Sequence, residues 1–187
     1  MKLIIPLFLL IIFFIMGCSN VDTQQEEIIG KGTPIIQNEV ENMKLTSPAF
    51  EHNQAIPSEY TCDGLDISPE LNIEGIPENT KSLVLISDDP DAPVRTWDHW
   101  IVFNIPPDTI KIKKNDEPFG IGGMNSWSRT GYGGPCPPSG THRYFFKVYA
   151  LDSELDIELG SNKDAIEAAM KGHILEKAEL IGTYRRN

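Results

Sequence analysis

The sequence is short of basic residues. Lys and Arg together number 16 against 27 Asp and Glu, which gives a formal net charge of -11 at pH 7. Such an acidic chain is poorly suited to the phosphate backbone of nucleic acids or to anionic lipid headgroups. We therefore expect no nucleic-acid partner, and electrostatic attraction cannot be what brings this protein to a membrane.

The sequence also lacks the common signatures of hydrolases and metalloenzymes. Neither Gly-x-Ser-x-Gly nor His-Glu-x-x-His occurs, and the histidines and cysteines match no familiar zinc-ligand spacing. No internal repeat is visible, and residues 44–187 are of single-domain size. These absences predict one globular domain that is not an enzyme and that holds no metal or cofactor.

A long apolar run occurs at the N-terminus, where Leu3 to Met16 follows Lys2. The run is shorter than the roughly 20 residues that span a bilayer and contains a proline, which argues against the alternative of a retained membrane helix. It ends in Gly17-Cys18, a small residue before cysteine, as in a bacterial lipoprotein signal. We expect residues 1–17 to be a signal peptide and Cys18 to carry lipid, so that the protein is an exported bacterial lipoprotein anchored on the extracytoplasmic face of a membrane.

Residues 18–43 are rich in Gln, Glu, Asn and Thr, and Gly30, Gly32 and Pro34 interrupt any regular period. This composition predicts a flexible tether, because it buries too little apolar surface to order itself. The pairs Ile28-Ile29 and Ile35-Ile36 are the exceptions, and the alternative is that they pack on the domain.

Several short segments rich in β-branched and aromatic residues, separated by Pro, Gly, Asn and Asp, predict a mainly β fold built as an antiparallel sandwich. The predicted strands are Leu71 to Ile73, Ser82 to Ser87, His99 to Ile105, Tyr144 to Leu151 and Glu179 to Tyr184.

One helix is predicted, from Lys163 to about Lys177, with Ser161 or Asn162 as its N-cap and Gly172 as a residue that may divide it.

Residues suited to an anion site gather at the strand ends and in two loops. His99 and His142 supply imidazole N–H groups, Tyr144 supplies a phenol, and the backbone at Gly133-Gly134 supplies amides. Asp89 is the candidate acid that holds an imidazole in one tautomer and favours its charged form. The sequence therefore predicts a small concave site for a phosphate or a carboxylate.

From about Thr46 to Arg186 the sequence resembles the phosphatidylethanolamine-binding protein family, whose bacterial branch is often called Raf kinase inhibitor-like proteins. Ten ordered blocks carry this resemblance: Ser47-Pro48-Ala49-Phe50, Tyr60 to Gly64, Ser68-Pro69, Asp89 to Pro93, Trp97, His99, Gly133 to Pro138, His142-Arg143-Tyr144, Gly172 to Leu175 and Ala178 to Tyr184.

The resemblance implies two packed antiparallel sheets with one or two short peripheral C-terminal helices, and a pocket that accepts phosphate-like groups. The expected lining residues are Asp89, Trp97, His99, Gly134, Pro138, His142 and Tyr144. The expected function is non-catalytic binding of small anionic or phosphorylated headgroups resembling that of phosphatidylethanolamine. The alternative is that the protein regulates or inhibits a protease or a signalling protein by direct contact, with a partner that the sequence does not identify.

Three residues are expected to support the site without touching ligand, namely Asp91, Pro93 and Arg143. Asp91 is either a turn acid or the partner of Arg143, which alternation along a strand places on the face opposite His142. Asp98 is a departure, because some family members carry a second histidine there, and an acid makes the rim more negative.

Two further features of the site stay open between alternatives. Trp127 and Tyr132 belong either to a mobile rim of the site or to an ordinary exposed loop. Cys62 and Cys136 are either a disulfide, as an exported protein permits, or two reduced thiols, as in cytosolic family members.

Overall fold

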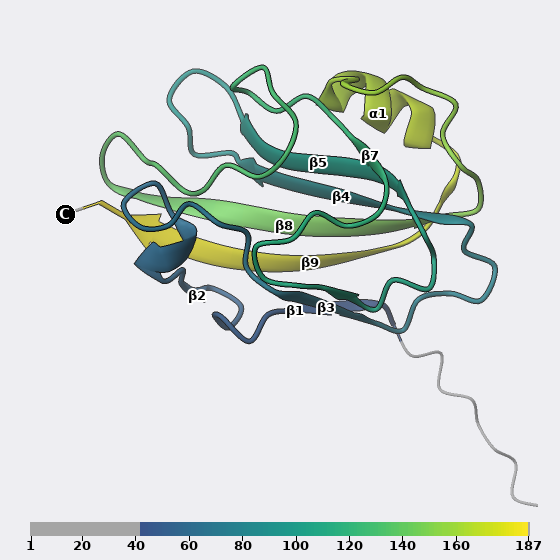
Figure 1. The fold of residues 1–187 in the computed structure, drawn as a ribbon, viewed down its shortest axis with the longest axis horizontal. Helices are drawn as coiled ribbons and strands as arrows, with labels where there is room; N and C mark the ends of the chain where they lie inside the picture. The colour runs from purple at the N-terminus through teal and green to yellow at the C-terminus, as the bar shows by residue number, and fades with distance from the viewer. Residues whose placement is uncertain (1–41, 187) are drawn as a thin grey trace, which may run out of the picture. The chain divides into compact units, whose positions relative to one another are not determined.

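The computed structural model of the protein describes residues 42–186 (Figure 1). The predicted signal peptide at 1–17, the predicted lipidation site Cys18 and all but the last two residues of the predicted tether lie outside the described residues. None of the helices that the structure describes combines the length and the apolar character that a membrane span requires.

Two β-sheets form the body of the fold, as predicted. The smaller sheet has three strands in the order β1-β3-β6, and the larger has six in the order β2-β9-β8-β4-β5-β7. The elements are β1 (Lys44–Thr46), β2 (Gln54–Ala55), the 3-10 helix η1 (Ser58–Tyr60), β3 (Leu71–Glu74), β4 (Ser82–Asp89), β5 (Trp97–Ile105), β6 (Lys111–Ile112), β7 (Ile121–Gly122), β8 (Thr141–Leu151), α1 (Lys163–Met170) and β9 (Ile174–Arg185).

The larger sheet is buried on both faces along its centre. One face packs against the smaller sheet through a core that includes Leu85, Trp100 and Phe146, and the other face packs against α1 through Ile86 and Ile166. All eight residues of β4 are buried, which explains its nearly continuous apolar sequence. Figure 1 shows the long strands β5, β4, β8 and β9 side by side, with β1 and β3 along one margin and α1 near one end.

Strand pairing is antiparallel throughout except between β2 and β9. The pair Gln54–Ala55 lies parallel to Gly182 and Thr183 at the edge of the larger sheet. The short β2 leaves the sheet after two residues, so this exception changes neither the layers nor the position of the long strands.

The predicted helix is right in its start and wrong in its end. Asn162 is the N-cap, and its side-chain oxygen accepts a hydrogen bond of 3.0 Å from the amide of Ala165. The helix ends at Met170 rather than near Lys177, because Gly172 adopts a left-handed φ of 88° that turns the chain. Residues from Ile174 onward join β9, where pairing with β8 satisfies their backbone groups.

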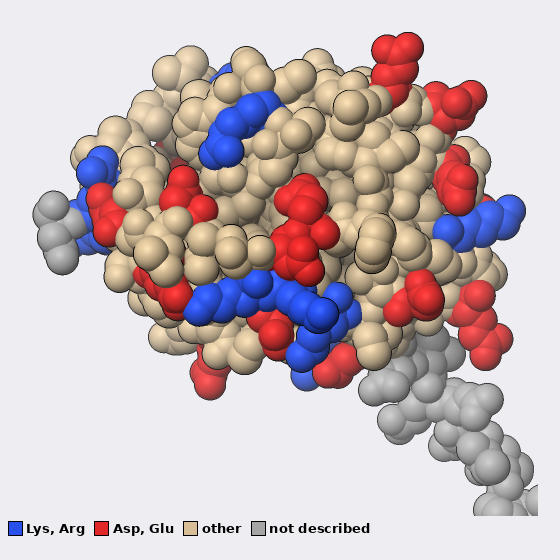
Figure 2. All heavy atoms as spheres, in the orientation of Figure 1, with Lys and Arg blue, Asp and Glu red and all other residues tan. Residues whose placement is uncertain are grey.

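Charged residues of both signs share the surface. On the face shown in Figure 2, acidic side chains are scattered widely and the basic ones gather mainly into a short row next to an acidic cluster. The visible surface is thus not a continuous basic patch, which agrees with the acidic composition.

Candidate functional site

A pocket of about 370 Å³ lies where three neighbouring strands of the larger sheet, β8, β4 and β5, come to one end. This volume is within the range of small-molecule sites. Its walls are formed by Cys62, Asp66, Asp89, Ala92, Pro93, Trp97, His99, Trp127, Arg129, Gly134, Cys136, Pro138 and His142. Six of the seven expected lining residues, all except Tyr144, are therefore brought together.

The strongest contact in the pocket wall joins Asp89 at the end of β4 to His142 near the start of β8. The Nδ1 atom of His142 lies 2.7 Å from Oδ2 of Asp89, and both side chains are almost fully buried. The other carboxylate oxygen accepts a hydrogen bond of 2.8 Å from the amide of Asp91, which shapes the turn after β4. Asp89 therefore orients the imidazole of His142, as predicted. The Nε2 atom of this ring is not used in that contact.

His99 is held by backbone rather than by an acid. Its Nδ1 atom lies 2.7 Å from the carbonyl oxygen of Gly133, and the Gly133 amide in turn donates to the His99 carbonyl at 3.1 Å. Because a carbonyl only accepts, Nδ1 of His99 must carry a proton. In both histidines the proton on Nδ1 is engaged, so Nε2 is the nitrogen left for a ligand.

A β-bulge explains how His99 reaches the pocket. Ser87 pairs with Trp100 and Asp88 pairs with Asp98, so His99 is an extra residue in β5. His99 and Trp100 are consecutive, yet both face the side of the sheet that carries Tyr144. Burial lowers the pKa of His99 below its ordinary value of 6.5, although the Gly133 carbonyl and nearby carboxylates act in the opposite direction.

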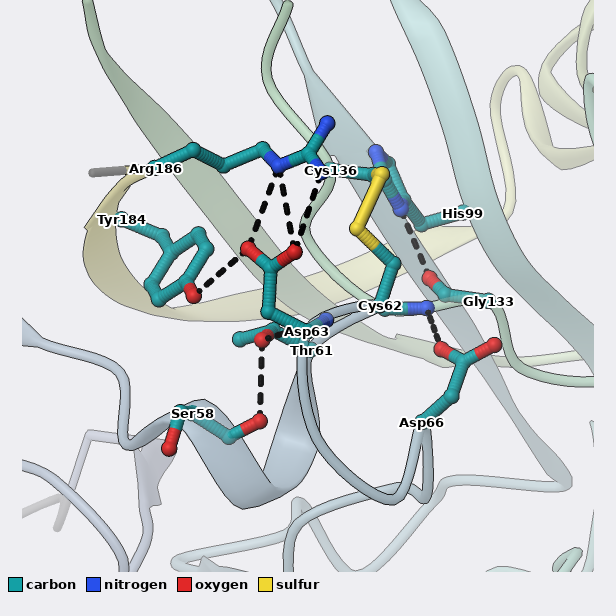
Figure 3. Close-up of a disulfide and its surroundings, with 11 residues drawn as sticks. Ser58, Thr61, Cys62, Asp63, Asp66, His99, Gly133, Cys136, Tyr184 and Arg186 are labelled. Atoms are coloured by element: carbon teal, nitrogen blue, oxygen red, sulfur yellow. Dashed lines mark hydrogen bonds and ion pairs between the residues drawn. A yellow bond between two sulfur atoms is a disulfide. The ribbon is translucent and has the colours of Figure 1, made fainter.

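A disulfide joins two loops across the pocket wall. Cys62 and Cys136 are bonded, with their Cα atoms 5.5 Å apart, so the structure selects the first of the two open alternatives. Figure 3 shows the disulfide beside His99 and close to the hydrogen bond that this ring donates to the Gly133 carbonyl. The loops also meet where the Gly134 amide donates to Asp66 at 2.6 Å, an approach that a Cβ on Gly134 would block.

Aromatic rings form another part of the wall. Trp97 and Trp127 pack edge to face with their centroids 5.4 Å apart, and Trp127 also packs edge to face on His99. Tyr132, in contrast, turns inward to the core and donates its hydroxyl to the carbonyl of Tyr60 at 2.8 Å. Of the two aromatic residues in this loop, Trp127 belongs to the rim and Tyr132 does not.

The comparison with protein families matches residues 46–185 to the model described as phosphatidylethanolamine-binding protein. The chain belongs to the phosphatidylethanolamine-binding protein family. A UPF0098 protein of Methanothermobacter thermautotrophicus is 51% identical over 150 residues, which cover 77% of this chain and 99% of that protein. A UPF0098 protein of Pyrococcus horikoshii is 44% identical over 196 residues, covering 100% of this chain and 91% of that protein.

Solved structures of the family share the fold. A phosphatidylethanolamine-binding protein homologue from Chlamydia trachomatis, CT736, superposes with a TM-score of 0.76 at 44% identity, covering 78% of this chain and 99% of its own. Escherichia coli YbcL superposes with a TM-score of 0.72 at 30% identity, with the same coverage of 78% and 99%. These comparisons confirm the predicted family and the predicted mainly β fold.

Several expected anion donors are already engaged or buried. Tyr144 lies behind the pocket wall at 1% exposure, packed against the rings of both His99 and His142. The amides of Gly133 and Gly134 donate to the His99 carbonyl and to Asp66. Tyr144 is thus not a lining residue, which corrects its expected place. The two amides are not available to a ligand, because both already donate hydrogen bonds, one to β5 and one to the loop of Asp66.

The sequence suggested that Asp98 makes the pocket rim more negative, but the structure places this residue away from the rim. It lies on the opposite face of the sheet, outside the lining residues, and pairs with Lys163 of α1 at 3.1 Å. Lys163 also forms an ion pair of 2.7 Å with the buried Asp88. Asp88 forms a second ion pair with Lys147. These two acids therefore have basic partners behind the pocket.

The predicted supporting residues are placed largely as expected. Asp91 pairs with Arg143, and neither lines the pocket, whereas Pro93 does. The residues that sequence reasoning missed are Asp66, Ala92 and Arg129, and the signal that could have found Arg129 is its position two residues after Trp127 in the candidate rim. No cluster of three or more metal-ligating side chains occurs within residues 42–186.

The ion pair of Asp91 predicts a pH dependence of stability. Hydrogen bonds from Arg143 hold the pKa of Asp91 at about 2, below its ordinary value of 3.8. A lowered folded-state pKa stabilises the fold above the unfolded pKa, and this contribution is lost as the pH falls from about 3.8 toward about 2. We expect Asp91→Asn to be less stable than wild type near neutral pH and to approach it in this acid range.

Chemical denaturation of both proteins across the acid range measures this difference. Arg143→Gln is the matched variant, because it removes the same ion pair from the other side and should remove most of the same pH-dependent component, while the backbone amide of residue 143 still donates to Asp91. A difference between wild type and Asp91→Asn that stays constant with pH would contradict the assignment.

The disulfide is expected to contribute substantially to stability. It joins two residues with a sequence separation of 74, and a cross-link of this kind lowers the entropy of the unfolded chain. The double variant Cys62→Ser, Cys136→Ser should lose about 2–4 kcal/mol of unfolding free energy. Urea denaturation measures the loss, and reduced wild type should match the double variant. Equal stability of oxidised and reduced protein would disprove this contribution.

Proposed function

We propose that this family member binds a small phosphorylated or otherwise anionic headgroup in the pocket, without catalysis, while a lipid on Cys18 tethers it to a membrane. The observation that carries the proposal is the pair of buried histidines whose Nδ1 atoms are fixed by Asp89 and by the Gly133 carbonyl. Both rings line the same pocket, so their two Nε2 atoms are the imidazole nitrogens left to contact a shared ligand.

Binding without catalysis is supported by the types of side chain in the wall. Among the described residues that line the pocket there is no serine, threonine or lysine, and the two cysteines are bonded to each other. The wall therefore presents no hydroxyl, amine or free thiol nucleophile, and its two carboxylates already accept hydrogen bonds from within the protein. Its rings and fixed polar atoms suit recognition of shape and charge instead.

Proton uptake should accompany the binding of an anion. A neutral imidazole offers a lone pair at Nε2, whereas a protonated one donates a hydrogen bond to a phosphate oxygen. A bound anion therefore favours the protonated form of the rings that contact it. For a ligand of constant charge, affinity should consequently increase as the pH falls through the range in which the imidazoles gain a proton.

Titration with phosphoethanolamine and with inorganic phosphate, followed through histidine NMR signals of the purified full chain, tests the binding function. Saturable shifts are expected for His99 and His142, larger at about pH 6 than at about pH 8. His52 and His173 lie outside the pocket and serve as internal controls. His142→Ala should weaken binding about tenfold, because it removes a charge-assisted hydrogen bond. An absence of saturable shifts at His99 and His142 would refute the function.

The tether is tested separately through Cys18, which precedes the described residues. Cells expressing the full chain should incorporate radiolabelled palmitate into it, and Cys18→Ala should abolish the label and release the protein from the membrane fraction. The variant Cys62→Ser, Cys136→Ser is the control and should keep the label. Unchanged labelling of Cys18→Ala would exclude this site of lipidation.

A further inference from the structure

Arg129 lies in a loop that is fixed by one buried side chain, Asn125. The side-chain oxygen of Asn125 accepts hydrogen bonds from the amides of Trp127 at 3.0 Å and Arg129 at 3.3 Å, and its side-chain nitrogen donates to the carbonyl of Gly131 at 2.9 Å. The Asn125 amide also donates to the Arg129 carbonyl at 2.9 Å. Asn125 is 4% exposed, so the backbone that carries Arg129 is anchored to the body of the domain.

The pocket wall contains two carboxylates and therefore needs a permanent positive charge to hold an anion. Asp66 and Asp89 contribute negative charge to the wall, and burial lowers the pKa of His99. A protonated His142 would only balance its partner Asp89. Among the described lining residues, Arg129 is the one side chain with a permanent positive charge.

The guanidinium of Arg129 is not neutralised by an acid. It takes part in none of the ion pairs formed within residues 42–186. Its carbon Cζ lies 5.8 Å from the centroid of the Trp127 ring, and this ring forms the adjacent wall. Arg129 is exposed, so this cation–π contact restrains the guanidinium only weakly, and it leaves the N–H groups free to bind an oxyanion.

We propose that Arg129 is a ligand-binding residue that supplies the fixed positive charge of the pocket and selects oxyanions that present two oxygens to its planar fork. A phosphate monoester dianion is the ligand class that best matches this geometry and charge. The inference rests on the proposed anion-binding function and extends it to the identity of the group that recognises charge. The histidines then adjust affinity with pH, while Arg129 maintains it when they are neutral.

The titratable and charged groups around the ligand give this proposal a pH signature. Within the pocket they are Asp66, Asp89, His99, His142 and Arg129, with Tyr144 buried behind the rings and Asp88 and Asp98 on the opposite face of β4 and β5. Burial and the charge of Asp89 raise the pKa of Tyr144, so its phenol stays neutral. Phosphate itself gains a proton between about pH 8 and about pH 6, so wild type and variant are compared with each other at the same pH.

Titration of the purified full chain with inorganic phosphate at about pH 8 and about pH 6 tests the proposal by calorimetry. Loss of one charge-assisted contact predicts about tenfold weaker binding of Arg129→Gln than of wild type at the higher pH, with a smaller deficit at the lower pH. Arg129→Lys keeps the charge but loses the fork, and it should fall between the two.

Arg95→Gln is the matched control, because Arg95 is an exposed arginine near the same pocket that does not line it. This control should bind phosphate as wild type does at both pH values. If wild type and Arg129→Gln bind equally at both, Arg129 has no role and the anion-binding function still stands. If wild type shows no saturable binding at either pH, the anion-binding function fails and this inference fails with it.

Discussion

The hydrogen bond between Asp89 and His142 is the contact on which the rest of the pocket depends. It joins the end of β4 to the start of β8 at 2.7 Å, and both side chains are almost fully buried. Because the second oxygen of Asp89 holds the amide of Asp91, the same carboxylate fixes an imidazole and the turn that carries Ala92 and Pro93 into the wall. Loss of this carboxylate would leave a buried polar ring without a partner.

The register of the central strands turns this single contact into a site. Side chains alternate between faces of a sheet, so a slip of one residue in β4 would place Asp88 in the pocket instead of Asp89. The present register sends Asp88 to the far face, where Lys147 and Lys163 balance its charge. The bulge in β5 then brings His99 to the face that carries Asp89. Alternation along β4 and β5, together with the bulge at His99, thereby separates structural acids from the acid of the site.

Much of this arrangement could be predicted from the sequence, because strand periodicity and motif residues encode it. Strand periodicity predicts β3, β4, β5, β8 and β9, and the motif residues predict the contact of Asp89 with a histidine and the outward direction of Arg143. The parts that could not be predicted depend on loop paths. Whether the Gly133 and Gly134 amides face a ligand or a neighbouring loop, and whether Arg129 reaches the pocket, is decided by contacts distant in sequence. The helix end was missed because residues after Gly172 suit a strand as well as a helix.

The acidic composition does not conflict with the proposed anion site, because the net charge and the pocket donors act over different distances. At physiological ionic strength exposed charges are screened beyond about 8 Å, so a net charge of -11 mainly slows the approach of an anion. In the proposed site, affinity is decided by oriented donors at contact distance, and the two imidazoles are buried so that water weakens their contacts less. A small number of fixed donors suffices there, provided that each is held by a second group. Asp89, the Gly133 carbonyl and Asn125 perform this function for His142, His99 and the loop of Arg129.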